Sequence, residues 1–191
     1  MIIGISGRIA AGKETLTQFL RDKGIKYFET RQVLIQILKE QGKEITRSNM
    51  QDLGDRLRKD GGAGALMQKI LERINYQDEN WIIDSLRNSG EAEFLRKKLG
   101  KNFILISVDA PREIRFKRMK ARMKQADNSN WEEFLKVDER DNFDKENPMG
   151  QQTGKLIEMS DYVIVNDGKL EDAMKKMEDI WEEIKIFSNH F

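Results

Sequence analysis

The sequence predicts a three-layer α/β/α protein in which helices cover both faces of a five-stranded parallel sheet. Short apolar runs alternate with helical patterns along the chain, and this order is typical of parallel sheets. A segment containing glycine and lysine joins the first apolar run to the first helix. All five runs end in polar residues, which we expect at the edge where parallel sheets bind ligands.

Five segments have the character of strands. Residues 2–6 are apolar around a single glycine, and residues 102–110 (NFILISVDA) are the longest apolar run. Residues 25–29, 81–85 and 162–166 are shorter. The polar residues at the five ends are Gly7–Lys13, Thr30 and Arg31, Asp84–Arg87, Asp109, and Asn166 with Asp167.

Helical patterns fill most of the remaining chain. In the first of them, Leu16, Phe19 and Leu20 share one face, and Pro111 occupies a permitted first-turn position in a later one. Residues 143–157 have no clear periodicity, and we expect them to be irregular. The predicted helices cover residues 13–23, 30–42, 48–59, 64–75, 90–99, 111–124, 131–142 and 169–187.

Composition excludes several classes of site. The 191 residues are enough for one domain, which we expect to span residues 1–191. The chain has no cysteine and one histidine, His190, so neither a thiolate zinc site nor a Ser-His-Asp triad can form. The formal net charge of +1 gives no reason to expect nucleic acid or an anionic membrane as a partner.

No segment has the pattern of a signal peptide or of an apolar span of roughly 20 residues. We therefore expect a cytoplasmic protein. The sequence leaves its oligomeric state open.

The segment GRIAAGKET, residues 7–15, predicts a phosphate-binding loop. Gly7 and Gly12 allow a tight turn that points backbone N–H groups inward, and the following helix adds the positive end of its dipole. Lys13 is placed to reach the outer phosphates. We expect the nucleotide to contact the loop through Gly7, Arg8, Ala10, Ala11, Gly12, Lys13, Glu14 and Thr15.

Glu14 follows the lysine, where most such loops have a serine or threonine that binds magnesium. A carboxylate near a triphosphate is repelled unless Mg²⁺ lies between them. Glu14 either holds the ion, directly or through water, or only stabilises the first turn of its helix by about 0.3–1 kcal/mol. Thr15 is the hydroxyl expected to contact phosphate.

With its Gly-Lys-Glu-Thr loop, the chain resembles the P-loop kinases of nucleotides and related small molecules, adenylate kinases among them. Residues 53–58 (LGDRLR) are similar to a stretch in archaeal kinase-like P-loop proteins. The resemblance implies a P-loop NTP hydrolase fold with a helical acceptor-binding insertion at about residues 30–80. It also implies a lid at about residues 115–157, and ATP and Mg²⁺ as cofactors.

Two of the strand ends match positions that hold the acceptor in these kinases. Arg31 corresponds to a cation that binds the acceptor's phosphate, and Arg87 corresponds to the arginine of the D-G-x-P-R segment. Asp84 of that segment would sit beside Mg²⁺ or its water. Ser85 and Leu86 replace the glycine and proline of the pattern, so the resemblance does not define the acceptor.

The resemblance also implies functional residues in the lid and near the adenine. Arg118 and Arg122 lie on the basic helix that leads into the lid and would stabilise charge during phosphoryl transfer. Arg140 either closes onto ATP or pairs with acidic neighbours. Asn166 and Gly168 either edge the adenine or only begin the last helix. Arg56 is expected to contact the acceptor from the helical insertion.

These residues favour an ATP-dependent phosphotransferase that acts on a small acceptor, most simply a nucleoside or deoxynucleoside monophosphate. Lys13, Asp84, Arg118 and Arg122 would be its catalytic residues. A dephospho-CoA kinase-like enzyme is an alternative, although Thr30 and Arg31 follow the second strand where an acid is typical of that enzyme. A second alternative is a nucleotide-binding regulatory module with little turnover. A guanine-specific Asn-Lys-x-Asp motif is absent, which disfavours a GTPase.

Overall fold

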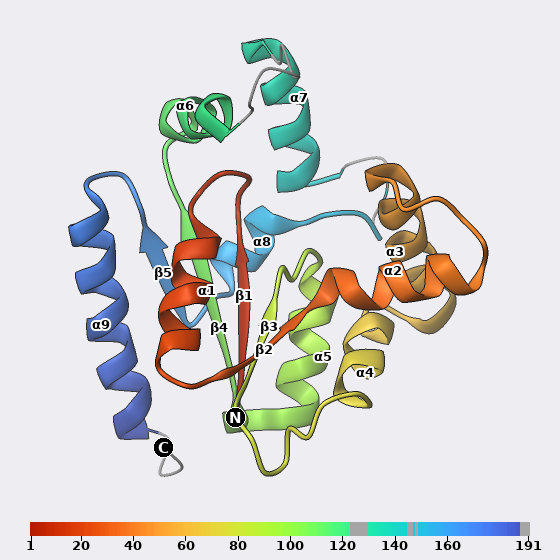
Figure 1. Ribbon diagram of the computed structural model, residues 1–191, viewed down its shortest axis with the longest axis horizontal. Helices are drawn as coiled ribbons and strands as arrows, with labels where there is room; N and C mark the ends of the chain where they lie inside the picture. Colours follow the sequence, from red (N-terminus) through yellow and green to blue (C-terminus); the bar gives the residue numbers. More distant parts are fainter. Residues whose placement is uncertain (123–129, 145–146, 148, 188–191) are drawn as a thin grey trace.

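The computed structural model describes residues 1–122, 130–144, 147 and 149–187 (Figure 1). Five strands form one parallel sheet, as the sequence predicts, and their order in the sheet is β2-β3-β1-β4-β5. Each strand is followed by a polar segment. The strands are β1 (Ile2–Gly7), β2 (Lys26–Glu29), β3 (Trp81–Asp84), β4 (Phe103–Asp109) and β5 (Tyr162–Val165).

The helices agree with the predicted segments to within a few residues, with two exceptions given below. Residue pattern and capping explain several of their ends: Asn88 and Asn130, for example, each cap a helix through a reciprocal contact with a glutamate three residues later. The described helices are α1 (Lys13–Asp22), α2 (Thr30–Glu40), α3 (Arg47–Gly61), α4 (Ala65–Leu71), α5 (Ser89–Leu99), the 3₁₀ turn η1 (Gly100–Asn102), α6 (Arg112–Arg122), α7 (Trp131–Asn142), α8 (Thr153–Glu158) and α9 (Leu170–Phe187).

Alternation along the strands builds a core on each face of the sheet. Ile3 and Ile5 of β1 pack with α1 and α9 on one face, whereas Ile2 faces the other side. That second core includes residues of α4 and α5. Figure 1 shows α1 and α9 together on one side of the sheet and α5 on the opposite side. Because both faces of the sheet are covered, the central strands β1, β3 and β4 are largely buried and apolar, whereas the edge strands β2 and β5 are partly exposed.

The carboxyl edge of the sheet positions the site. In Figure 1 this edge faces upward, with α6 and α7 above it and α2, α3 and α4 to its right. The loop between β1 and α1 lies at the centre of the edge, because β1 is the middle strand. Segments far apart in the sequence therefore meet around this loop.

Two expectations about local structure are wrong. Residues 143–157 are not wholly irregular, since α8 begins at Thr153. This helix has only six residues, too few for a periodic signal, and it is held by burial of Thr153 and Leu156. The helix expected over residues 64–75 ends at Leu71, where a turn with a hydrogen bond from Arg73 N to Ile70 O replaces it.

Within the described ranges, no helix is both long enough and apolar enough to cross a bilayer.

Candidate nucleotide-binding site

The loop from Gly7 to Lys13 has a left-handed backbone at three positions. The φ angles are 139° at Gly7, 57° at Ala10 and 109° at Gly12. A Cβ atom on Gly7 would lie 2.2 Å from the carbonyl oxygen of Val108, so this position requires glycine for space as well as for conformation. The result is a tightly curved loop at the start of α1, the geometry of an anion-binding concavity.

Lys13 folds over the loop that precedes it. Its Nζ donates to the carbonyl oxygens of Gly7 at 2.9 Å and of Arg8 at 3.2 Å. Gly12 caps α1 without a side-chain hydrogen bond from any described residue, and the start of a helix is a favourable place for an anion. Thr15 lies in the same first turn, and its N–H donates to Gly12 O at 3.1 Å.

Asn166 connects the end of β5 to the loop. Its Nδ2 donates to Ala11 O at 2.9 Å, and its Oδ1 accepts from Arg118 Nη2 at 3.1 Å. Arg118 Nη1 also donates to Asn166 O at 3.1 Å and to Ala11 O at 3.3 Å. Gly12 lies against the side chain of Asn166, since a Cβ atom on Gly12 would be 2.4 Å from Asn166 Nδ2. The structure thus brings together the loop and two of the residues expected near the nucleotide.

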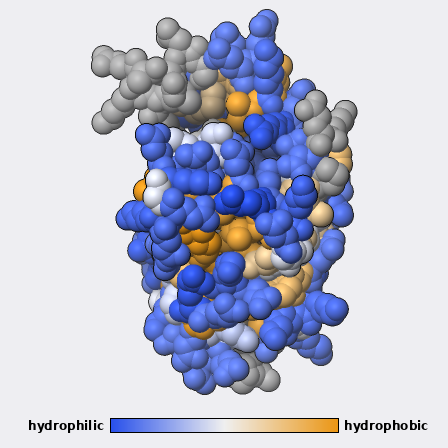
Figure 2. Space-filling view, turned by 90° about the vertical axis from the view of Figure 1, so that its right-hand side faces the viewer, coloured by the Kyte–Doolittle hydropathy of each residue, from blue (hydrophilic) through white to orange (hydrophobic). Residues whose placement is uncertain are grey.

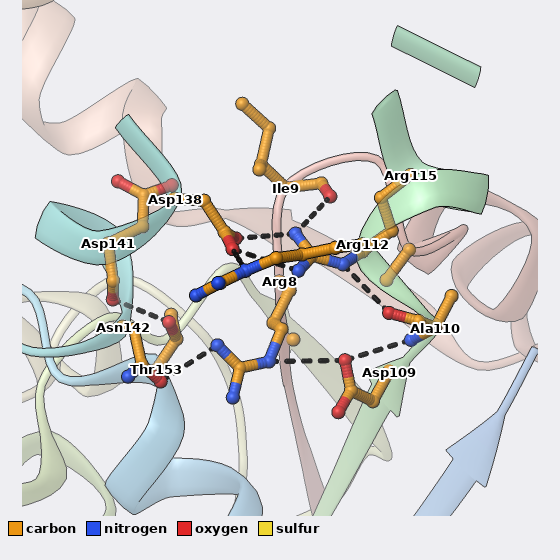
Figure 3. A network of polar contacts seen from close by, with 12 residues as sticks. Arg8, Ile9, Asp109, Ala110, Arg112, Arg115, Asp138, Asp141, Asn142 and Thr153 are labelled. Carbon is orange, nitrogen blue, oxygen red and sulfur yellow. Dashed lines mark hydrogen bonds and ion pairs between the residues drawn. The ribbon is translucent and has the colours of Figure 1, made fainter. Parts of the chain in front are cut away.

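Arg8 connects the loop to β4 and α7 (Figure 3). Its Nε lies 3.2 Å from Asp109 Oδ1, and its Nη1 donates to Asn142 Oδ1 at 2.8 Å. The sequence predicts that Arg8 contacts the nucleotide as part of the loop. In the structure its side chain is bound to Asp109 and Asn142, so it fixes the loop to its surroundings.

A buried ion pair joins α6 to α7 in the same network. Arg115 and Asp138 are 2% and 1% exposed, and Arg115 Nη2 donates to Asp138 Oδ2 at 3.0 Å. Arg112 Nε donates to that oxygen at 2.8 Å, while Arg115 Nε donates to Ala110 O at 2.8 Å. Burial acts to raise the pKa of Asp138, but the hydrogen bonds and charges of the two arginines outweigh it and hold the pKa below its usual range.

A cavity of about 350 Å³ lies between the loop, α1 and the ends of β2 and β3. Asp84 lines it, and its Oδ2 accepts from the hydroxyl of Tyr27 at 3.2 Å. Burial raises the pKa of the Tyr27 phenol, and the charges of Asp84 and Glu29 raise it further, so this hydroxyl stays protonated and donates. Glu14 also lines the cavity.

The residues present fit a magnesium ion that arrives with a nucleotide. Asp84 Oδ1 is buried and has no hydrogen-bond partner among the described residues. In the same part of the chain, no group of three or more His, Cys, Asp or Glu side chains is placed to hold a metal ion by itself. Mg²⁺ in nucleotide sites commonly uses one or two carboxylates together with phosphates and waters. Asp84 and Glu14 can supply those carboxylates.

A larger cavity of about 600 Å³ opens on the other side of the loop. Lys13, Arg31, Arg87 and Arg140 are among its lining residues. Arg31 forms no ion pair or hydrogen bond with any described residue, and Arg87 Nη1 lies 4.0 Å from Asp141 Oδ2. Figure 2 views the side of the molecule that lies at the right of Figure 1 and shows an apolar area within a hydrophilic face. A volume of this size suits a small molecule, and its cations suit an anionic one.

The arginines of α3 are placed differently from the expectation. Arg56 lies outside the lining of this cavity, and its Nη2 donates to Gln41 Oε1 at 3.2 Å. Arg58 lines the cavity instead, but it is 5% exposed and is paired with Glu91 at 2.9 Å and with Asp55 at 2.6 Å. Arg58 therefore supports the wall.

The remaining residues expected in the site are exposed or lie outside the described part of the chain. Arg140 is exposed, and its Nε lies 3.6 Å from Asp144 Oδ2, so the acidic pairing expected as one alternative is present. Gly168 is exposed in the loop after β5. The side chain of Arg122 lies outside the described part of the chain.

Glu29 and Ser85 are among the residues of the site that sequence reasoning missed. Glu29 ends β2 beside Asp84 in the sheet register and lines both cavities. Its position on a weak strand, just before Thr30, gave little signal. Ser85 has a φ of 67°, the left-handed conformation that glycine adopts freely, and it lines the larger cavity. The D-G-x-P-R pattern has a glycine at this position. The replacement of that glycine by serine was the sequence feature that could have indicated an unusual backbone here.

The strand order and the loop define a P-loop protein with the fold of small-molecule kinases. Shikimate kinase from Aquifex aeolicus superposes with a TM-score of 0.54 at 14% identity, covering 97% of this chain and 99% of that one. Dephospho-CoA kinase from Campylobacter jejuni gives 0.58 at 16% identity, covering 96% of both chains. At these identities the likeness establishes the fold.

Relatives at higher identity define the family. The AAA_18 family model, described as an AAA domain, matches residues 3–135. The UPF0200 protein of Sulfurisphaera tokodaii is 32% identical over 183 residues, which cover 96% of this chain and 97% of the relative. That of Methanosarcina mazei is 31% identical over 180 residues, covering 94% and 92%. The chain belongs to the UPF0200 family, with an AAA domain over residues 3–135.

Proposed function

We propose that the protein transfers the γ-phosphoryl group of ATP to a small acceptor. This proposal rests on one observation: residues of the phosphate-binding loop form part of the wall of the larger cavity. The left-handed loop that ends at Lys13 opens directly on the cavity lined by Arg31 and Arg87. A donor held on the loop would therefore present its terminal phosphate to an acceptor held by arginines.

The donor side would use residues already in contact with the loop. Lys13 and the loop amides bind the β- and γ-phosphates, and the Thr15 hydroxyl contacts phosphate. Arg118 and Asn166, which bond to each other and to the loop, would contact the base, as would Gly168 two residues after Asn166. Asp84 and Glu14 would hold Mg²⁺, which neutralises charge on the phosphate oxygens. Arg122 would add positive charge from the end of α6.

The acceptor side favours a nucleoside monophosphate as the first candidate. Arg31 and Arg87 would bind its phosphate, and Arg140 would approach from α7. An oxygen of that phosphate attacks the γ-phosphorus of ATP while the bond to the β,γ-bridging oxygen breaks, and ADP leaves. An ionised phosphate needs no base, so this reaction is a matter of positioning and charge stabilisation.

A hydroxyl-bearing acceptor is the second candidate, and Glu29 is the observation that favours it. Its carboxylate lines both cavities and has no hydrogen bond or ion pair to any described residue. An alcohol must lose its proton as it attacks phosphorus, and a carboxylate at this junction can accept that proton. A dephospho-CoA kinase-like reaction belongs to this class.

A product assay with the Glu29→Gln variant tests the proposal and separates the candidates. The full chain is incubated with Mg·ATP and, in turn, nucleoside monophosphates and dephospho-CoA, and phosphorylated acceptor is measured. With a monophosphate acceptor we expect the variant to keep wild-type kcat. With a hydroxyl acceptor, loss of the base lowers kcat by roughly 10²–10⁴-fold while ATP affinity is unchanged.

Wild-type protein that binds ATP but phosphorylates none of these acceptors would favour the regulatory module. A variant that loses ATP affinity would instead mean that Glu29 serves the donor.

A further inference from the structure

Two buried oxygen atoms at the smaller cavity have no hydrogen-bond partner among the described residues. They are Asp84 Oδ1, at the end of β3, and Thr17 Oγ1, one turn into α1. Thr17 is 6% exposed, and both residues line the cavity of about 350 Å³ together with Lys13 and Glu14. A buried oxygen without a partner loses the free energy of its bonds to water, so such atoms indicate a missing ligand.

Neighbouring residues fix Asp84 so that one oxygen is left for such a ligand. The Tyr27 hydroxyl donates to Oδ2, and Thr30 Oγ1 donates to the backbone oxygen of Asp84 at 2.6 Å. Neither contact involves Oδ1. A carboxylate oxygen is acceptor-only when ionised, so a group that satisfies Oδ1 must be a cation or a donor such as metal-bound water.

Thr17 lies on the same face of α1 as Lys13, because residues four apart lie one above the other on a helix. The hydroxyl that comparable loops carry directly after the lysine is replaced here by Glu14, which is exposed. Thr17 therefore offers a hydroxyl one turn further along α1, in the cavity that Asp84 also lines.

We propose that Thr17 and Asp84 together bind the water shell of the divalent cation that accompanies the nucleotide. Thr17 supplies the hydroxyl that position 14 lacks, and Asp84 supplies the charge. The inference rests on the proposed function, since it requires a nucleotide on the loop. It assigns Thr17 a role that neither the sequence motif nor the family relationship provides.

The test is the affinity of Mn²⁺ for the ADP complex, measured by the loss of the free Mn²⁺ signal in electron paramagnetic resonance. Wild type is compared with Thr17→Val, which has nearly the same shape without the hydroxyl, and with Thr17→Ser, which keeps the hydroxyl. Calorimetry of ADP without metal measures the nucleotide site separately. Thermal unfolding without ligand measures the structural effect.

We expect Thr17→Val to weaken Mn²⁺ binding by about three- to tenfold, as the loss of one hydrogen bond predicts. ADP affinity without metal stays at the wild-type value, and Thr17→Ser restores Mn²⁺ affinity. The melting temperature of ligand-free Thr17→Val should equal or exceed that of wild type, because the variant removes a buried hydroxyl that has no partner.

Unchanged Mn²⁺ affinity in Thr17→Val would overturn the inference, as would a lowered melting temperature, which would reveal a structural partner for the hydroxyl. Wild-type protein that binds no ADP would overturn the nucleotide site itself. The two failures are therefore distinguishable.

Discussion

At the scale of single residues, the site depends on backbone conformations that side chains disfavour. Ala10 and Ser85 both have positive φ angles, 57° and 67°, and both line the larger cavity. For a residue with a Cβ atom this conformation costs roughly 1–2 kcal/mol. Strain of this kind persists where the surrounding structure requires a particular shape, and here it shapes the space beside Lys13.

Ser85→Gly should stabilise the protein. Glycine adopts this φ without steric cost, although the greater freedom of the unfolded chain offsets part of the gain. We expect the free energy of unfolding in urea to rise by up to about 1 kcal/mol. Gly12→Ala provides the reverse comparison, since its Cβ would collide with Asn166. A less stable Ser85→Gly variant would show that the serine side chain has a stabilising contact.

At the scale of secondary structure, α7 is fixed to the rest of the site by charge. Asp138 receives hydrogen bonds from Arg112 and Arg115, and Asn142 accepts one from Arg8. Helix α7, which lies in the region predicted to form a lid, is therefore tied to α6 and to the loop (Figure 3). Removing one member of a buried pair leaves the other charge without compensation.

Asp138→Asn should lower the free energy of unfolding at pH 7 by about 3 kcal/mol. The pKa of Asp138 is below its usual range in the folded state, so its contribution is present above the ordinary aspartate pKa, roughly 3.9, and disappears as the pH falls below it. The difference between wild type and variant should therefore shrink in acid.

Urea unfolding at pH 7 and below pH 4 measures this difference. Glu178→Gln, which removes the exposed pair with Lys23, is the control and should change stability by less than about 1 kcal/mol. A pH-independent difference between wild type and Asp138→Asn would contradict the role of the charge.

The elements that could be predicted from the sequence are those with a strong local signal. The five strands and α1 follow from apolar periodicity, and the loop follows from its glycines and lysine. The short helix α8 could not be predicted, because contacts with distant segments hold it. The place of Glu29 depends on how β2 aligns with β3, and that alignment is set by tertiary packing.

Residues with the same charge can also have different positions and roles in the structure. The arginines of the basic helix look alike in sequence, yet Arg115 is buried in an ion pair while Arg118 bonds to the loop and to Asn166. Likewise Arg56 and Arg58 are two residues apart on α3, so they point in different directions. These roles depend on how each helix is rotated about its axis relative to the sheet. The sequence does not specify that rotation directly.

At the scale of the whole molecule, the loop is the point at which distant segments meet. Arg8 connects it to β4 and α7, and Asn166 connects it to β5. The larger cavity is lined by Lys13 of the loop and by Arg140 of α7. The loop and this cavity are thus parts of one connected structure, which is what the proposed phosphotransfer would require.

The most direct test of this account is calorimetric titration of ADP into wild type and Lys13→Ala, with Lys23→Ala, at the C-cap of the same helix, as a control. We expect wild type and the control to bind ADP equally. Loss of charge-assisted hydrogen bonds should weaken binding to Lys13→Ala by roughly 10- to 100-fold. Equal affinity in all three proteins, or no binding to wild type, would contradict the claim that residues 7–13 hold a nucleotide.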